Sequence, residues 1–511
     1  MWSAKSASNS TAESSFAVMT NIHNKMATGA AWMVMFKAFE RSIGLISTVI
    51  LARLLVPADF GLIMMAMSII AALELLGAFS FDVALIQNRD ASREHYDTAW
   101  TCNVLFGLSC FAMLLALAAP AAHFYDEPRL LPLIATLGVG NLIGGFENIG
   151  IVAFRKNLQF QQEFKFLAAK KVISFTVTVT AAYLLRNYWA LVAGMLTGRI
   201  VGVIISYVMQ AYRPRFCLQK FNELFSFSKW LLANNFIFFL VHRSADFVIG
   251  RMLGAKSLGL HGIAYEISNL PTTEMVAPIN RAVFPGYAKI ASDQAALRDS
   301  YLKVTSAIAM FAVPAATGIA GVAKAAVFLL LGDKWLDAVV LVQVLAFYGA
   351  IGALQTNTGP VYIAIGKPRI LTVTSLIYVC TLLPLLLVGI NLHSLPGVAW
   401  AFLIVALLNM PINLAFLMRE LNISLGLLLA GVWRPILGAA VMYGVVSQIS
   451  YLFGSITDSH QAALQLSVLV LSGCLTFVAL VLASWHLAGR PEGAEQWVLS
   501  NVQQRLARWG A

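Results

Sequence analysis

The stretch LARLLVPADFGLIMMA at residues 51–66 returns about 198 residues later as IGRMLGAKSLGLHGIA at residues 249–264. Each copy lies where one long apolar segment ends and the next begins. A helix, a short turn and a second helix that recur at this spacing are typical of internally repeated membrane transporters. The sequence therefore predicts a duplicated unit. The positions that carry the same residue in both copies are Arg53 with Arg251, Leu55 with Leu253, Gly61 with Gly259, Leu62 with Leu260, and Ala66 with Ala264.

The composition places the chain in a lipid bilayer. Of its 511 residues 59% are hydrophobic and 12% are charged, and the mean hydropathy is +0.77. A soluble domain carries about 25% charged residues, so this chain could not stay dissolved as a globule. The five cysteines show no CxxC spacing, and neither a disulfide framework nor a metal site is therefore predicted.

Apolar runs long enough to cross the hydrocarbon core recur along nearly the whole chain. Lipid offers backbone polar groups no partner, so we expect helices. The sequence predicts fourteen transmembrane segments, near 27–54, 60–82, 98–119, 130–153, 166–185, 189–212, 224–250, 257–280, 304–331, 336–364, 370–390, 396–418, 432–450 and 463–488.

The distribution of basic residues predicts the orientation. With a cytoplasmic N-terminus, inner loops and tails hold about 20 of the 35 Lys and Arg, and outer loops hold about 5. We therefore expect a multi-pass protein of the bacterial inner (plasma) membrane with both termini in the cytoplasm. The net charge of +11 forms no basic stripe with interleaved aromatic residues, so nucleic acid is not an expected partner.

The connections and tails contain no hidden enzyme domain. The longest predicted connection, residues 281–303, is too short for one. Residues 1–24 are expected to be a disordered cytoplasmic tail, and residues 490–511 an amphipathic cytoplasmic tail. The run GVGNLIGG at residues 138–145 lies inside an apolar segment with no preceding strand, which predicts close helix packing rather than phosphate binding.

Several motifs resemble one transporter family. They are ARLLVPADFGLIMMA at 52–66, ALIQ at 84–87, ADFVIGRMLGAKSLGLHGIAYEISNLP at 245–271, PINRAVFP at 278–285 and GPVYIAIGKPR at 359–369. The chain resembles the polysaccharide transporter family of lipid-linked oligosaccharide flippases (Wzx type), within the MOP superfamily that also holds MATE antiporters and lipid II flippases. His261 and Gly262 stand where that family often has an aromatic residue and a polar neighbour.

The resemblance implies an all-α polytopic fold with about fourteen transmembrane helices. Two six-helix lobes, residues 25–215 and 216–420, would surround a central cavity, and residues 421–489 would add two C-terminal transmembrane helices. Alternating access would carry a polar headgroup from the inner to the outer leaflet.

Cations at membrane depth are the candidate headgroup-binding residues, because such groups are costly in lipid and usually functional. Lys37 and Arg41 are four residues apart and share a helix face. Arg243 occupies the corresponding place in the second repeat: the repeat offset carries Arg41 to Phe239, one turn before it. Both arginines are therefore predicted to face a shared cavity. Arginine suits a diphosphate because its planar fork donates paired hydrogen bonds.

Arg199 and Lys324 are further candidate cations, although both could instead reach an interface. Internal ion pairs are the alternative for the main candidates, Lys37 with Glu40 and Arg243 with Asp246. Glu40, Asp246 and Glu266 are candidates for coupling to a proton or sodium gradient, and no other cofactor is expected. Three more acidic residues lie at depth, namely Glu74, Asp82 and Glu147.

The leading hypothesis is a non-enzymatic flippase. Its substrate would be an undecaprenyl diphosphate-linked oligosaccharide for exopolysaccharide, capsule or O-antigen assembly. Expected partners are membrane lipids, a polysaccharide polymerase and the export machinery. A MATE-like antiporter of organic cations is the second hypothesis. A membrane polysaccharide polymerase or ligase is the third, and it would need a long outer loop that the sequence lacks.

Overall fold

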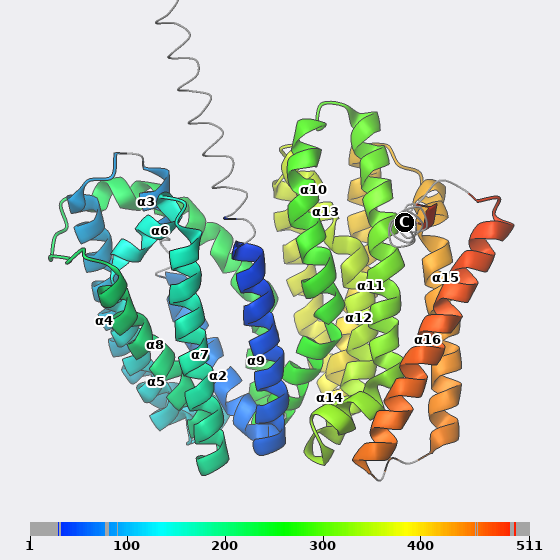
Figure 1. The fold of residues 1–511 in the computed structure, drawn as a ribbon, viewed down its shortest axis with the longest axis horizontal. Helices are drawn as coiled ribbons and strands as arrows, with labels where there is room; N and C mark the ends of the chain where they lie inside the picture. Colours follow the sequence, from blue (N-terminus) through cyan, green and yellow to red (C-terminus); the bar gives the residue numbers. More distant parts are fainter. Residues whose placement is uncertain are drawn as a thin grey trace, which may run out of the picture. The chain divides into compact units, whose positions relative to one another are not determined.

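The fold is seen in a computed structural model of the whole chain (Figure 1). The structure describes residues 29, 32–76, 81–88, 90–454, 456, 458–490 and 495–496. These residues form helices and connections and contain no strand. The predicted tail 1–24 lies outside the described residues, and so does most of the predicted tail 490–511.

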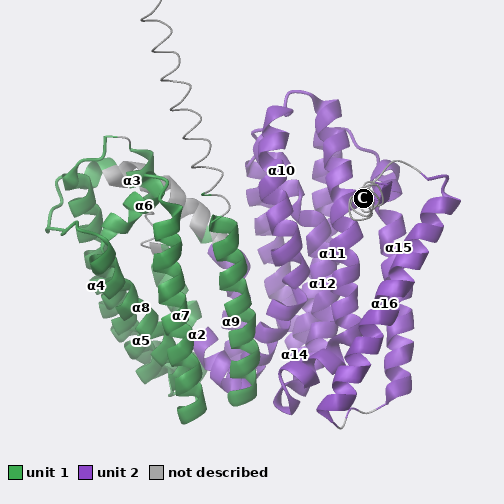
Figure 2. Cartoon of the chain, viewed as in Figure 1, with its two compact units in different colours: residues 1–55, 66–236 green, residues 56–65, 237–511 purple. Residues whose placement is uncertain are grey.

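The chain divides into two compact units, residues 1–55 with 66–236 and residues 56–65 with 237–511 (Figure 2). In unit 1, α4 packs on α5, α5 on α8, and α7 on α8. The helices of unit 1 are a helix at 32–54, most of α2 (Pro57–Leu76), α3 (Phe81–Gln87), α4 (Arg93–Tyr125), α5 (Leu130–Gly145), the short η1 (Ile149–Ile151), α6 (Val152–Lys156), α7 (Phe160–Leu185), α8 (Trp189–Met209) and the first part of α9 (Phe221–Ser268).

Unit 2 is built around α11, which packs against α12, α15 and α16. Two of its long elements are pairs of helices: α9 is broken at Gly254 (φ 76°), and α14 at His393 and Ser394. Its elements after α9 are η2 (Pro271–Val276), α10 (Ala277–Lys289), α11 (Gln294–Leu330), η3 (Asp333–Ala338), α12 (Val339–Thr356), α13 (Thr358–Ala364), α14 (Arg369–Leu421), α15 (Leu425–Phe453) and α16 (Ser459–Leu487).

The helical prediction is confirmed, because every predicted segment overlaps helix. By length and apolarity nine helices of the described residues could cross a membrane, and ten if a bent pair counts as one. The count of fourteen therefore stays a prediction. The bent pair corrects the segment predicted at 130–153: α5 ends at Gly145, and residues 149–156 turn away by 62°.

The connection predicted at 281–303 is also corrected. It is helical except for residues 290–293, because α10 runs on to Lys289 and α11 begins at Gln294. The Asp293 side chain accepts hydrogen bonds from the amides of Ala295 (3.1 Å) and Ala296 (3.0 Å). This N-cap satisfies the first free amides of α11, so a helix can begin well before the apolar stretch.

The two repeat copies pack directly on each other inside unit 2. A Cβ built on Gly61 would lie 1.7 Å from the carbonyl oxygen of Ala255, and one built on Gly259 would lie 1.9 Å from that of Pro57. The repeat offset converts Gly61 into Gly259 and Pro57 into Ala255, so the contact is symmetric. Only glycine allows two helix backbones to approach this closely. The repeat motif is therefore the contact between the copies.

Two residues at the start of α2 stabilise the N-terminus of this helix. Pro57 is the first residue of α2, where its missing N–H costs nothing. The carboxylate of Asp59 accepts a hydrogen bond from the amide of Val56 at 3.1 Å, which is the reciprocal half of a capping box. The helix start fixes where Gly61 meets the second copy.

An extended segment, residues 210–220, joins α8 to α9, and we call it the strap. Three side chains of α4 hold its backbone: Asp97 accepts from the amide of Arg215 (2.9 Å), Thr101 from Cys217 (3.0 Å) and Thr98 from Lys220 (3.3 Å). Asp97 also accepts from the Tyr212 hydroxyl. Consequently the strap stays with unit 1, and the two units divide after Phe236. The lobe boundary at 215/216 stays a prediction.

The strap hydrogen bonds are well protected. Asp97, Thr98 and Thr101 are all buried. Tyr212 lies beyond the end of α8, where burial and the adjacent Asp97 carboxylate raise the pKa of its phenol well above the usual value. The phenol is therefore neutral at physiological pH and remains a hydrogen-bond donor.

Candidate functional site

Two adjoining cavities inside unit 1 are lined by charged side chains. One has a volume of about 330 Å³ and the other about 230 Å³. The side chains of Lys170 on α7 and Arg199 on α8 line both. We call the two together the polar cavity. The other charged side chains that line it are Glu74, Asp82, Glu147, Arg155 and Glu163.

Arg199 is bound on two sides within the polar cavity. Its Nη2 lies 3.6 Å from Oε1 of Glu74 on α2 and donates to Oδ1 of Asn141 on α5 at 3.3 Å. Room for the guanidinium comes from Gly144, since a Cβ there would lie 3.1 Å from Nη1. On the same helix a Cβ on Gly140 would lie 2.9 Å from Leu196. The predicted packing role of the 138–145 glycine run is confirmed.

The other cations of the polar cavity also face carboxylates. Lys170 Nζ lies 3.0 Å from Oε2 of Glu147, which follows the end of α5. Arg155 on α6 donates to Oε1 of Glu163 on α7 and lies 3.8 Å from Asp82. Glu163 is buried, and its Oε2 has no hydrogen-bond partner among the described residues.

The charge balance limits what the polar cavity can bind. Four carboxylates face three cations, so the cavity has no excess positive charge for a diphosphate. Glu163 Oε2 can accept another hydrogen bond or cation, and Asn141 Nδ2 is a buried donor without a described partner. The chemistry suits a hydroxyl-rich or cationic group rather than a polyanion.

The first predicted pair of cations lies on the 32–54 helix of unit 1. Lys37 Nζ is 2.7 Å from Glu40 Oε2, and the side chains are 59% and 39% exposed respectively. The ion-pair alternative for Lys37 therefore holds in this structure. An exposed pair of this kind contributes little to stability, so Lys37 remains accessible to an anion. Arg41 is half-buried one turn further along.

Unit 2 holds the second predicted arginine. Arg243 on α9 donates to Asp246 at 3.2 Å, and the aspartate side chain is only 9% exposed against 38% for the arginine. Arg243 thus neutralises a buried carboxylate while its own head is reachable. Arg41 and Arg243 belong to different units, and the prediction that they face one cavity stays a prediction.

The remaining predicted residues of unit 2 lie apart from this pair. Lys324 on α11 donates to the carbonyl of Gly454 at 3.4 Å, just beyond the end of α15. Cations commonly bind free carbonyls at helix C-termini, which fits the interface alternative for Lys324. Glu266 is half-buried near the end of α9.

The sequence did not predict a cluster of three tyrosines in unit 2. The hydroxyls of Tyr348 on α12 and Tyr378 on α14 lie 3.1 Å apart, and the Tyr265 ring lies 6.0 Å from that of Tyr348. Phe402 and His261 stack beside them, with ring centroids 5.2 Å apart. Tyrosines look like ordinary membrane aromatics in a sequence. Asn141 and Glu163 were missed for a similar reason, because no spacing rule marks them.

The arrangement of helices defines the class of protein. The structure of "Lipid II flippase MurJ, inward closed conformation" superposes with a TM-score of 0.71, covering 89% of this chain and 99% of that chain at 14% identity. The fold is that of this solved structure, and the protein is a multi-pass membrane protein. The family model described as "Polysaccharide biosynthesis protein" matches residues 50–340. The chain belongs to this family.

Two curated relatives narrow the comparison. "Teichuronic acid biosynthesis protein TuaB" of Bacillus subtilis is 26% identical over 79% of this chain and 84% of its own length. "Lipopolysaccharide biosynthesis protein WzxC" of Escherichia coli is 25% identical over 76% of this chain and 80% of its own length. The solved structure that shares this fold is named a flippase rather than an enzyme.

Proposed function

We propose that the protein flips a lipid-linked oligosaccharide, carried on undecaprenyl diphosphate, from the cytoplasmic to the periplasmic leaflet by alternating access. The observation that carries the proposal is the family match over residues 50–340 on a flippase-like fold. The names of the relatives connect the family to teichuronic acid and lipopolysaccharide assembly. The product would enter exopolysaccharide, capsule or O-antigen synthesis.

The cations at membrane depth are the proposed headgroup ligands. Arg41 and Arg243 would hold the diphosphate by paired hydrogen bonds, and Lys37 would add a point charge. Exposure of the Lys37 and Arg243 side chains supports this role. Arg199 is the weaker candidate, because its Nη2 already contacts Glu74 and Asn141, and Lys324 is bound at a helix end.

The setting follows from the same reasoning. The basic inner loops favour a bacterial inner membrane protein with cytoplasmic termini. A proton or sodium gradient would drive flipping through Glu40, Asp246 or Glu266, and Asp246 is the most buried of the three. A polysaccharide polymerase and the export machinery would receive the product.

The test is translocation of a lipid-linked oligosaccharide in liposomes that contain the purified protein. Exposure of the glycan to an added glycan-cleaving enzyme should be faster than in empty liposomes. Arg41→Ala and Arg243→Ala should each slow it about tenfold or more, since a charged hydrogen bond contributes about 1.5–3 kcal/mol. Arg298→Ala, at a half-buried arginine paired with Asp299, should transport normally. Equal rates with and without protein would reject the proposal.

Cation antiport is the second candidate function, and the excess carboxylate of the polar cavity favours it. Ethidium uptake driven by a pH gradient in the same liposomes distinguishes the two. A flippase should leave ethidium uptake at the level of empty liposomes. Ethidium uptake that is lost in Glu163→Gln, together with absent glycan exposure, would establish the antiporter.

A further inference from the structure

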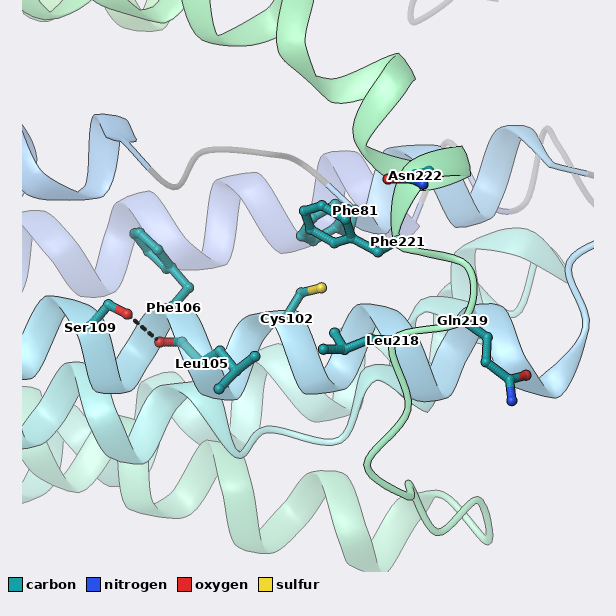
Figure 3. Close-up of a pocket in the computed structure, with 9 residues that line it drawn as sticks. All are labelled: Phe81, Cys102, Leu105, Phe106, Ser109, Leu218, Gln219, Phe221 and Asn222. Atoms are coloured by element: carbon teal, nitrogen blue, oxygen red, sulfur yellow. Dashed lines mark hydrogen bonds between the residues drawn. The ribbon is translucent and has the colours of Figure 1, made fainter.

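A separate cavity of about 570 Å³ lies at the strap end of unit 1 (Figure 3). One wall is a single face of α4, made by Cys102, Leu105, Phe106 and Ser109, whose spacing of three and four residues places them in one row. The row is about 10 Å long at a rise of 1.5 Å per residue. The volume is typical of a small-molecule site.

The lining of this cavity is apolar. Phe81 of α3 and Leu218 and Phe221 near the end of the strap form the opposite wall (Figure 3). The Ser109 hydroxyl donates a hydrogen bond to the carbonyl of Leu105 at 2.8 Å, so it has no free donor. Leu105 and Leu218 are 44% and 51% exposed, which shows that the cavity opens to the surroundings.

The strap carries cationic residues next to one end of the lining along the chain, although none of them lines the cavity. Gln219 and Asn222 mark this end of the lining, and the strap adds Arg213, Arg215 and Lys220. Lys220 pairs with Glu223 at 3.5 Å. Neither Arg213 nor Arg215 has a carboxylate partner among the described residues.

The nearby acidic residues do not cancel these two arginines. Asp97 faces Arg93 at 3.7 Å, and Glu223 also lies 3.2 Å from His95. Glu94 is exposed in the first turn of α4. Only about 10 Å of extended chain separates Arg215 from Leu218 at the mouth of the cavity. An apolar cavity with cations at its open end matches a ligand that has a hydrocarbon chain and an anionic head.

We propose that this cavity binds one acyl chain of an anionic membrane phospholipid, with the phosphate beside Arg213 and Arg215. Basic pockets at the cytoplasmic side of membrane helices bind anionic lipid headgroups, and the orientation proposed above places the strap at that side. The inference does not depend on flippase activity.

The wall itself favours a resident lipid over transported cargo. Hydrogen bonds from strap amides to the buried side chains of Asp97, Thr98 and Thr101 fix the strap on α4. A cargo site must open and close during each cycle, whereas a cavity whose wall is fixed in this way keeps its shape. The lipid would therefore remain bound while the transporter works.

The test uses phosphatidylglycerol with a diazirine in its acyl chain, mixed into phosphatidylcholine liposomes that contain the full-length protein. After illumination, mass spectrometry of the peptides should place labels at residues 102–109 and 218–222. Excess unlabelled phosphatidylglycerol should compete, and excess phosphatidylcholine should not. Leu105→Trp should fill the cavity and abolish this label, while Leu108→Trp, at an exposed leucine that does not line the cavity, should keep it.

Arg215→Gln provides a variant with little risk to folding, because Asp97 binds only the backbone amide of Arg215. Its labelling should require about fivefold more phosphatidylglycerol. Labels spread evenly over lipid-facing helices, or equal competition by phosphatidylcholine, would overturn the proposal. Labelling by a diazirine polyprenyl phosphate but not by phosphatidylglycerol would overturn it in favour of a cargo entrance.

Discussion

His261 shows how a residue's role can depend on its ring rather than on its polar atoms. It is 3% exposed and stacks on Phe402 with an interplanar angle of 28°. Its Nδ1 has no hydrogen-bond partner among the described residues. The histidine thus contributes a flat aromatic ring to the packing. The sequence predicts that this position is unusual, but only the structure shows how the ring packs.

The pair of Glu74 and Arg199 gives a test at the same scale. Glu74→Gln and Arg199→Gln should each lower the free energy of unfolding by about 1 kcal/mol, because both groups are half exposed and partly screened. The double variant should lose about 0.5–1 kcal/mol less free energy of unfolding than the two single losses added together. Thermal unfolding of the four proteins in detergent measures this coupling.

A pair of distant residues provides the control for this comparison of single and double variants. Glu74→Gln combined with Arg298→Gln should show additive losses, since the two residues belong to different units. If Arg199 instead binds the headgroup and not Glu74, the coupling vanishes. Flipping would then fall in Arg199→Gln alone and be unaffected in Glu74→Gln.

Among the elements, the strap is a connection in which one carboxylate accepts two of the hydrogen bonds that hold it. Asp97→Ala removes acceptors from the Arg215 amide and the Tyr212 hydroxyl, which should cost about 1–3 kcal/mol per group left unsatisfied. Limited trypsin digestion should therefore cut faster after Arg215 and Lys220. Asp90→Ala, at an exposed loop position, should digest like the parent. A strap equally resistant in Asp97→Ala would show that packing alone holds it.

The helices themselves were largely predictable, since apolar length decides them in a bilayer. Helix ends were less so. The break after Gly145 follows from the cap at Asn148, whose side chain accepts from the amide of Gly150 at 2.9 Å. The helical 281–303 region follows from the Asp293 cap. Hydropathy does not register either cap, because a cap depends on one short polar side chain and not on a run of residues.

The site could be predicted only in part. Charge at membrane depth identified Lys37, Arg199 and Arg243, and the structure shows each beside a carboxylate. Spacing along the chain predicted the partners of Lys37 and Arg243, which are three residues away. It could not predict Glu74 for Arg199, because they lie 125 residues apart on separate helices. Long-range pairing depends on tertiary packing that one sequence does not encode locally.

At the scale of the whole molecule, the contact between the repeat copies requires glycine at two positions. Gly61→Ala and Gly259→Ala should each lower stability by about 3 kcal/mol or more, because a backbone carbonyl occupies the space. Both should reduce the yield of folded protein and its unfolding temperature in detergent. Gly352→Ala on α12, with nothing within 4 Å of the added carbon, should change stability by about 1 kcal/mol or less.

Combining the two substitutions sharpens this test. Because both carbons enter one contact, the double variant should lose less than the sum of the single losses. Full additivity, or a Gly61→Ala variant as stable as Gly352→Ala, would contradict the symmetric contact.

The same contact determines how the gene can be divided. Residues 56–65 cluster with the second half of the chain although they precede most of the first. A fragment that starts at Ile237 would lack the ten residues that cover Ala255 and Gly259. The second unit is therefore incomplete without residues 56–65, and we expect a fragment that starts at Ile237 to fold only when the first part of the chain is also present.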